Sequence, residues 1–509
     1  MKHTKIAVII LLTFLSQQSN AFCGFYVAKA DASLFNKASQ VIMVRDGERT
    51  IITMSSDFKG SVKDFAMVVP VPVVLQEKDI RIAERVLFDK LDAYSGPRLV
   101  EYWDENPCYQ RIYESLKATN SMREENASAP ATDYLSKDED KKVTIEAKYT
   151  VGEYDILILS AKESGGLEEW LTENGYKIPK GARDVLEPYI KSNMKFFVVK
   201  VNLEEQAKSG SALLRPIQVS FNSPKFMLPI RLGMANAKDE QDLIIYTLTR
   251  SGRVETTNYR TVKIPTDKNI PEFVDDIFGK FYLDVYKRNR MKEGKNNVYL
   301  EYAWNISGFS SVKCDPCPAP PPIMADLVDA GVNWLRNVGG GAYDGSVHFT
   351  RLHVTYDREN FPQDLVFQET NNTENFQGRY IITHPAQGDL NCDEGKNYRK
   401  DLTMRRGKEL QQLASLTGWE VSGYSEYKYN FYDYELPSQP EMRKTITPKT
   451  QTIFPDDIKG SIEDEKVNDG SFQPVYATTE PKEDKKDYAT MAFIAVSLLM
   501  LVGVMKSKG

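Results

Sequence analysis

The chain has 509 residues, 41% of them hydrophobic and 27% charged, which is enough for about two to four domains with a buried core. Four of its 65 basic side chains lie near the termini, at Lys2, Lys5, Lys506 and Lys508. The body between them keeps 61 basic against 71 acidic side chains, a charge of −10. Nucleic acid is therefore not an expected partner, because nucleic-acid-binding proteins present a basic face.

Residues 1–21 have the pattern of a secretory signal peptide. Lys2 and Lys5 precede an apolar run at 6–15, and Ser19 and Ala21 are small residues where a signal peptidase cleaves. Ten apolar residues are too few to span a bilayer. The sequence therefore predicts export, with a mature chain that begins at Phe22.

The first part of the body is predicted to be rich in strands. Asp46 and Gly47 separate two β-branched runs, 40–44 and 50–54, which predicts a hairpin with a tight turn. The apolar run 65–72 predicts a strand buried on both faces, with its prolines at an edge or bulge.

Helices and strands are predicted to alternate in the rest of the body. Apolar residues at helical spacing predict helices at 79–94, 106–117, 167–174, 182–192, 271–292 and 398–419. Strands are predicted at 143–149, 154–160, 195–201, 217–221, 226–230 and 243–248, and a polar surface loop at 119–142. Of these helices, 271–292 is predicted to be the longest. The pattern indicates an α+β fold, mainly antiparallel sheet with several packed helices, with the body at 22–435 divided into lobes at 22–295 and 296–435.

The C-terminal part is predicted to hold the protein at a membrane. Residues 436–487 are rich in Pro, Thr, Ser, Glu and Lys, which is typical of a disordered stalk. Residues 488–505 form an uncharged apolar run of the minimal length for a transmembrane helix. The lysines in 506–509 predict a cytoplasmic tail. We therefore expect a single-pass membrane protein whose body lies on the extracytoplasmic side, periplasmic or outer.

The reactive side chains concentrate between residues 304 and 392. This stretch holds three of the five cysteines and three of the four histidines. They are Cys314, Cys317, Cys392, His348, His353 and His384. The run of prolines after Cys317 prevents the helix that a thioredoxin-like dithiol needs, so redox catalysis is disfavoured.

A zinc site and disulfides are the two other interpretations of these cysteines. Cys314 and Cys317 are half of a common zinc site, which His348, His353, His384 or Cys392 would complete. His348 and His353 are five apart, so on a strand they would face opposite sides. The favoured interpretation is disulfides, because export permits them. Cys314 would pair with Cys317, and Cys23 with Cys108 or Cys392.

Sequence motifs give no further support for an enzyme. The chain has no Gly-x-Ser-x-Gly, His-Glu-x-x-His, phosphate-binding loop or dinucleotide fingerprint. Carboxylate pairs for glycoside cleavage remain open, because they need not be close in sequence. Four arginines, Arg98, Arg351, Arg358 and Arg379, are candidates for buried ion pairs with Glu101, Asp357 or Glu369.

Several runs together resemble a bacterial family catalogued as domain of unknown function 2330. The runs are at 23–30, 64–72, 91–102, 314–318, 361–370 and 376–380, so the resemblance covers most of 22–419. It implies an exported bacterial protein with no assigned activity and no catalytic residues to carry over.

The sequence thus leads to two functional hypotheses. The first is a non-enzymatic, extracytoplasmic binding or scaffold module of the cell envelope, with a protein or another envelope component as its partner and no cofactor. The second is a metal- or carboxylate-dependent hydrolase of envelope polymers, for which zinc would be the cofactor. The hydrolase requires His353, His384 and the cysteines to converge in one cleft.

Overall fold

A computed structural model describes residues 25–29, 35–36, 39–55, 58–59, 65–108, 144–161, 164–173, 176–177, 182–202, 214–236, 240–307, 314–339 and 342–429. These ranges all belong to one structural unit, residues 1–458. The predicted signal peptide, the stalk, the apolar run 488–505 and Cys23 lie outside the described residues, as do the loop 119–142 and most of the helix predicted at 106–117. Within the described ranges, no helix is long and apolar enough to cross a membrane.

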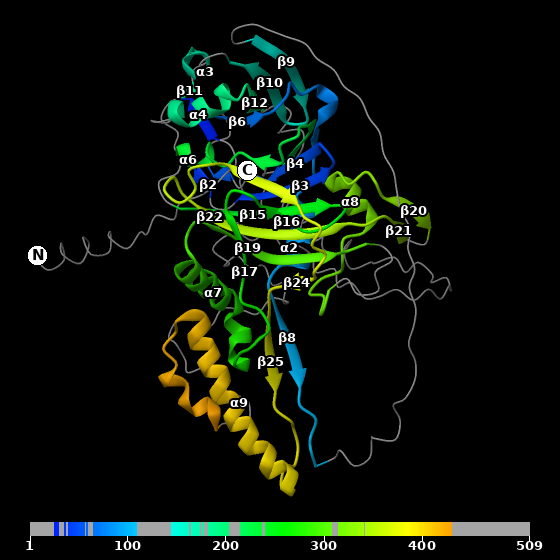
Figure 1. The fold of residues 1–509 in the computed structure, drawn as a ribbon, viewed down its shortest axis with the longest axis vertical. Coiled ribbons are helices and arrows are strands. Elements are labelled where there is room, and N and C mark those ends of the chain that lie inside the picture. The colour runs from blue at the N-terminus through cyan, green and yellow to red at the C-terminus, as the bar shows by residue number, and fades with distance from the viewer. Residues whose placement is uncertain are drawn as a thin grey trace, which may run out of the picture. The chain divides into compact units, whose positions relative to one another are not determined.

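The centre of the fold is a mixed, mostly antiparallel sheet of nine strands (Figure 1). In spatial order the main path is β17 (Arg260–Lys263), β19 (Asn297–Asn305), β22 (His348–Tyr356), β15 (Gln241–Thr249), β3 (Ser39–Asp46), β4 (Arg49–Ser55), β13 (Ile217–Asn222) and β7 (Ile80–Ile82), and β24 (Phe376–Gln377) pairs with β19. Only β15 with β3 and β17 with β19 run parallel within this sheet. The sheet takes strands from both sides of residue 295, so it joins the two stretches that were predicted as lobes.

The predicted hairpin between β3 and β4 is confirmed. Gly47 has a φ of +58°, in the left-handed region that the tight turn needs. Its strands pair from Gln40 opposite Ser55 to Asp46 opposite Arg49. The two strands thereby place alternate side chains on each face of the central sheet.

A second, antiparallel sheet of six strands packs on the central one. Its order is β11 (Tyr176–Lys177), β1 (Phe25–Lys29), β6 (Phe65–Val71), β12 (Lys195–Val201), β10 (Tyr154–Ser160) and β9 (Thr144–Val151). The facing side chains Val41 and Met43 of β3 share one core with Val69 of β6 and Ile156 of β10. As predicted, β6 is buried on both faces, because Val68 points the other way into a core with α3 and α4.

Helices cover the outer faces of the two sheets. The α-helices are α2 (Val86–Ser95), α3 (Ser164–Glu173), α4 (Ala182–Lys191), α6 (Gly233–Asn236), α7 (Phe278–Glu293), α8 (Met324–Ala330) and α9 (Asp393–Thr417), and the short 3-10 helices are η2 (Glu77–Asp79), η4 (Glu272–Ile277) and η5 (Ser422–Lys428). On the central sheet, Leu91 of α2 and Leu327 of α8 pack with Ile42 of β3 and Ile244 of β15. The layers are therefore helix, sheet, sheet and helix.

Two predictions about helices were wrong. The helix predicted at 79–94 begins only at Val86, because residues 80–82 form β7 and pair with β13. Among the helices of the described residues the longest is α9, with 25 residues, whereas α7 has 16. Helix α9 begins at Asp393, earlier than predicted, because Cys392 caps its N-terminus by accepting a hydrogen bond from the Gly395 amide.

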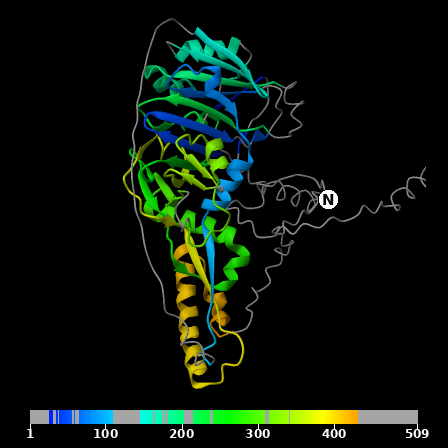
Figure 2. The ribbon, with the colours of Figure 1, turned by 90° about the vertical axis from the view of Figure 1, so that its right-hand side faces the viewer.

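A parallel strand pair leads away from the central sheet. β8 (Arg98–Trp103) lies beside β25 (Arg379–His384), which also pairs with β18 (Lys268–Asn269). Figures 1 and 2 both show β8 and β25 side by side. Just beyond their ends a disulfide joins Cys108 to Cys392, next to the start of α9.

Three smaller sheets complete the described fold. They are β14 (Met227–Leu228) with β23 (Leu365–Glu369) and β16 (Val254–Thr256); β2 (Phe35–Asn36) with β5 (Phe58–Lys59); and β20 (Arg336–Gly339) with β21 (Ala342–Asp344). The first of them contributes Leu228, Leu365 and Val254 to the core between the two large sheets. It thereby forms one wall of the groove described below.

Candidate functional site

The described cysteines all lie in disulfides. Cys314 is bonded to Cys317, as predicted. Cys108 is bonded to Cys392 across a separation of 284 residues. The predicted pairing of Cys23 with one of these two was wrong, because Cys108 and Cys392 pair with each other. Bonded sulfurs are not thiolates, so these four cysteines are not zinc ligands in this state.

The three histidines do not converge. His348 and His353 lie on β22 and face opposite sides of the sheet, whereas His384 lies on β25. Their polar contacts are also separate: His353 meets Glu301 and Asp242, whereas His384 meets Glu101 and Glu272. Over the described ranges, no group of three or more His, Cys, Asp or Glu side chains is placed to hold a metal ion. The convergence that the hydrolase hypothesis requires is not found there.

A buried charge network lies where the central sheet meets α2 and α7. Arg351 of β22 is fully buried; its Nε lies 2.6 Å from a carboxylate oxygen of Glu301 and its Nη1 lies 2.5 Å from one of Asp92. Tyr246 donates a hydrogen bond of 2.7 Å to Asp92, and Tyr282 donates one of 2.5 Å to Glu301. Each charge is compensated, which a buried ion needs to persist.

His353 extends this network towards α7. Its Nδ1 is 2.8 Å from Glu301 and its Nε2 is 3.3 Å from Asp242. Its ring stacks on that of Tyr286, with centroids 3.8 Å apart. Burial alone would lower the pKa of His353, but the charge of Glu301 and the hydrogen bonds to both carboxylates outweigh it and raise the pKa to about 9.

The pKa of Glu301 is shifted in the opposite direction to that of His353. Burial would raise the pKa of its carboxyl, but the charges of His353 and Arg351, with hydrogen bonds from His353 and Tyr282, lower the pKa to about 2. Glu301 and Arg351 are fully buried and His353 is 4% exposed. The network is therefore closed to a ligand, and it holds α2 and α7 to the sheet.

The ion-pair partners predicted for the arginines were wrong. Arg351 binds Asp92 and Glu301, and Arg379 binds Asp267 and Asp315. The other two bind carbonyl oxygens: Arg98 those of Tyr94, Gly96 and Pro316, and Arg358 that of Met234. Burial was predicted correctly for Arg98 and Arg351, whereas Arg358 is exposed and Arg379 is partly exposed.

His384 lies in a small cluster that is partly open to solvent. Its Nε2 is 2.9 Å from Glu101 and its Nδ1 is 3.6 Å from Glu272. Its ring stacks on Trp103, which is 63% exposed. Glu272 also pairs with Arg406 of α9 at 2.5 Å. The cluster thus ties the β8–β25 pair to η4 and α9.

A concave site lies between the two large sheets and the small β14 sheet, and we call it the proline-lined groove. It has a volume of about 510 Å³, within the range of about 300–1,000 Å³ that ligand sites occupy. Its walls are mainly apolar and include five prolines, Pro70, Pro72, Pro188, Pro224 and Pro229. Sequence reasoning missed it because its lining comes from segments far apart in the chain.

Polar groups gather at one end of the proline-lined groove. Asp364 accepts hydrogen bonds from the Tyr189 hydroxyl at 2.6 Å and from the Arg231 guanidinium at 3.0 Å. The guanidinium also lies over the Tyr189 ring, 4.9 Å from its centroid. The Nε of Arg231 is buried and has no hydrogen-bond partner in the described part of the chain. The groove therefore combines apolar walls with an unused donor, as ligand sites commonly do.

Comparison with known proteins supports the resemblance seen in the sequence. No curated protein and no solved structure matches the chain. One family model does match, over residues 17–368, and its description is "Uncharacterized protein conserved in bacteria (DUF2330)". The match begins near the predicted signal cleavage site and ends within β23, so it includes both walls of the proline-lined groove. Because it covers more than half of the chain, the protein belongs to the DUF2330 family of uncharacterized bacterial proteins.

Proposed function

We propose that the protein is a membrane-anchored, extracytoplasmic binding module of the cell envelope, which holds an apolar segment of an envelope protein in the proline-lined groove. The observation that carries the proposal is the groove itself. Proline and aliphatic side chains form its walls, and Arg231, with a free Nε, lies at one end. An apolar segment would gain about 25 cal/mol for each Å² of apolar surface that it buries there.

The predicted compartment supports the same proposal. The signal-like leader and the apolar run 488–505 predict export and anchoring. The Cys108–Cys392 and Cys314–Cys317 disulfides suit an oxidising compartment. A binding role also needs no catalytic group in the groove, where Arg231 and Asp364 are paired with each other and Lys225 is a third ionic side chain of the lining.

Site-specific photocrosslinking in intact cells tests the proposal. A photoreactive amino acid replaces Met227, which is half-buried on β14 and lines the groove. The control replaces Met291 of α7, which is 75% exposed and lies outside the groove lining. We expect an envelope protein to be crosslinked from position 227 and not from position 291, and the full-length protein to stay with membranes after carbonate extraction.

Two results would overturn the proposal. One is the absence of an adduct at position 227 together with its absence at a second groove position, Ser192. The other is release of the full-length protein into the soluble fraction, since an anchored module stays with the bilayer. Equal adducts at positions 227 and 291 would mean random collision, which also counts against the groove.

A further inference from the structure

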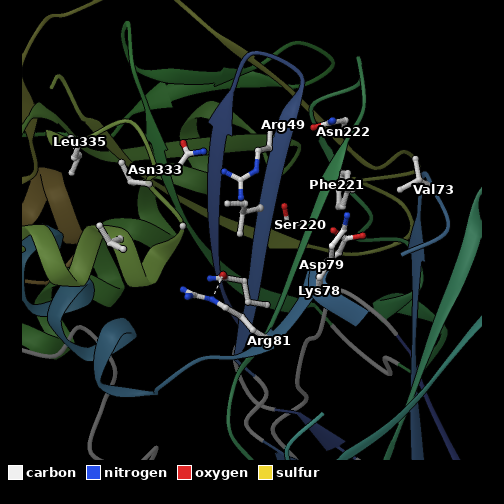
Figure 3. Close-up of a pocket in the computed structure, with 15 residues that line it drawn as sticks. Arg49, Val73, Lys78, Asp79, Arg81, Ser220, Phe221, Asn222, Asn333 and Leu335 are labelled. Carbon is white, nitrogen blue, oxygen red and sulfur yellow. Dashed lines mark hydrogen bonds between the residues drawn. The ribbon is translucent and has the colours of Figure 1, made fainter. Parts of the chain in front are cut away.

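A second hollow lies on the opposite side of β13 from the proline-lined groove. We call it the basic hollow; its volume is about 850 Å³. Side chains alternate along a strand, so Gln218, Ser220 and Asn222 line the basic hollow while Val219 lines the groove. Figure 3 shows the β3–β4 hairpin in the middle of the lining. Asn333 and Leu335 lie on one side of the hairpin, and Val73, Lys78 and Asp79 lie on the other.

The lining of the basic hollow is cationic in a protein that is acidic overall. It contains Arg49, Lys78 and Arg81 against one carboxylate, Asp79. That carboxylate accepts a hydrogen bond of 2.9 Å from the backbone N–H of Gln76. One carboxylate oxygen of Asp79 is therefore directed into the turn of η2. The hollow therefore has an excess of two positive charges, and anions are attracted to such a concave cationic surface.

The charge of Arg81 is positioned but not neutralised. Its guanidinium donates hydrogen bonds to the side-chain oxygen of Gln218 and to the backbone oxygen of Asp329, both of which are uncharged. Gln218 is itself buried and donates to Thr53 at 2.7 Å, which fixes its orientation. Arg81 is thus held at the wall of the hollow with its positive charge available to a ligand.

Arg49 has no ion pair with its cross-strand neighbour Asp46, whose carboxylate binds another arginine. Asp46 is its cross-strand neighbour on the same face of the hairpin. Both oxygens of Asp46, however, bind Arg250, at 2.6 and 2.8 Å. In the described part of the chain, neither Arg49 nor Lys78 has a carboxylate within ion-pair distance.

The remaining lining suits a ligand larger than a simple ion. Ser220, Asn222 and Asn333 supply polar groups that hydrogen-bond to none of the described residues. Val73 and Val328, which are 36% and 44% exposed, add apolar surface at the rim. The two guanidinium groups, of which that of Arg81 is held in place, favour phosphate, because Arg binds phosphate oxygens in a bidentate geometry.

We propose that the basic hollow binds a phosphate-bearing molecule, with Arg49 and Lys78 in contact with the phosphate and Arg81 contributing its charge. The phosphate would belong either to a soluble phosphate ester or to a lipid headgroup. The inference does not depend on the proposed function, because the two hollows share only Phe221 in their linings. Failure of crosslinking in the groove would leave it intact.

Calorimetric titration of the full-length, detergent-solubilised protein tests the inference. One probe is glycerol 3-phosphate, and the others are vesicles of phosphatidylcholine with and without phosphatidylglycerol. The test variant is Arg49→Gln with Lys78→Gln, and the control is Lys287→Gln, an exposed lysine of α7 that lies outside the hollow. Thermal unfolding of both variants confirms that they fold.

We expect binding that weakens with added salt and falls at least about tenfold in the double variant, since two charge-assisted contacts are lost. Lys287→Gln should bind like the unmodified protein. Saturation by glycerol 3-phosphate would identify a soluble ester, and binding only to vesicles with phosphatidylglycerol would identify a lipid. Failure of the unmodified protein to bind either probe, or equal losses in test and control variants, would overturn the inference.

Discussion

His353 makes the stability of the protein depend on pH in a defined direction. The pKa of His353 is raised from its ordinary 6.5 to about 9, so the protonated ring stabilises the fold fully below about pH 6.5. This stabilisation is lost as the pH rises through 9. The interval of about 2.5 between the two pKa values corresponds to about 3 kcal/mol, at about 1.36 kcal/mol for each pKa unit.

The measurement compares the unmodified protein with His353→Gln, which keeps a polar side chain but cannot carry the charge. Urea unfolding gives the free energy of unfolding of each protein at about pH 6 and about pH 10. We expect the unmodified protein to lose about 3 kcal/mol more than the variant over this range. The comparison of two proteins removes the contribution of other titrating groups.

His348→Gln is the matched control on the same strand. His348 is also buried, at 5% exposed, but burial lowers its pKa, so its effect on stability has the opposite sign: stability is gained as the pH rises past the ordinary value of 6.5. The unmodified protein should therefore lose no stability relative to this control as the pH rises from about 6 to about 10. A constant difference for His353→Gln, or an equal fall for His348→Gln, would refute the reasoning about the Glu301 network.

Three further predictions concern stability. Arg351→Met should cost about 3–5 kcal/mol in urea unfolding, because it leaves buried carboxylates without their cation; a loss below about 1 kcal/mol would contradict this. Replacing Cys108 and Cys392 together by serine should lower the free energy of unfolding by about 2–5 kcal/mol, because the bond closes a very long loop; an unchanged urea midpoint would argue against it. Gly331→Ala should lower the melting temperature more than Gly47→Ala, because a Cβ at Gly331 would lie 2.5 Å from an Ile51 methyl and one at Gly47 meets nothing within 4 Å; equal shifts would refute the packing argument.

The local parts of the fold were predictable from the sequence. Alternation of β-branched residues around Asp46 and Gly47 predicted the β3–β4 hairpin, and the continuous apolar run at 65–72 predicted a strand with two buried faces. These signals depend on residues close in the chain. The fold class followed from them, as an α+β protein with mostly antiparallel sheet.

The non-local parts could not be predicted because no local pattern encodes them. Glu301 sits where the register of β19 shifts between Leu300 and Tyr302, so alternation does not reveal which face it takes. The pairing of Cys108 with Cys392 depends on β8 lying beside β25. The sequence did indicate the stretch 304–392 as the one richest in cysteine and histidine, and this stretch contributes Arg351 and His353 to the buried network.

The pairing of β8 with β25 also has a consequence for how the chain acquires its structure. Arg98 lies opposite Arg379, and β3 pairs with β15 some 200 residues later. Contacts of such high contact order form slowly, and β8 has no pairing strand in a nascent chain that ends before β25. C-terminal truncations that remove β25 should therefore leave the edge of β8 unpaired and give aggregation-prone products, whereas chains that retain β25 should fold.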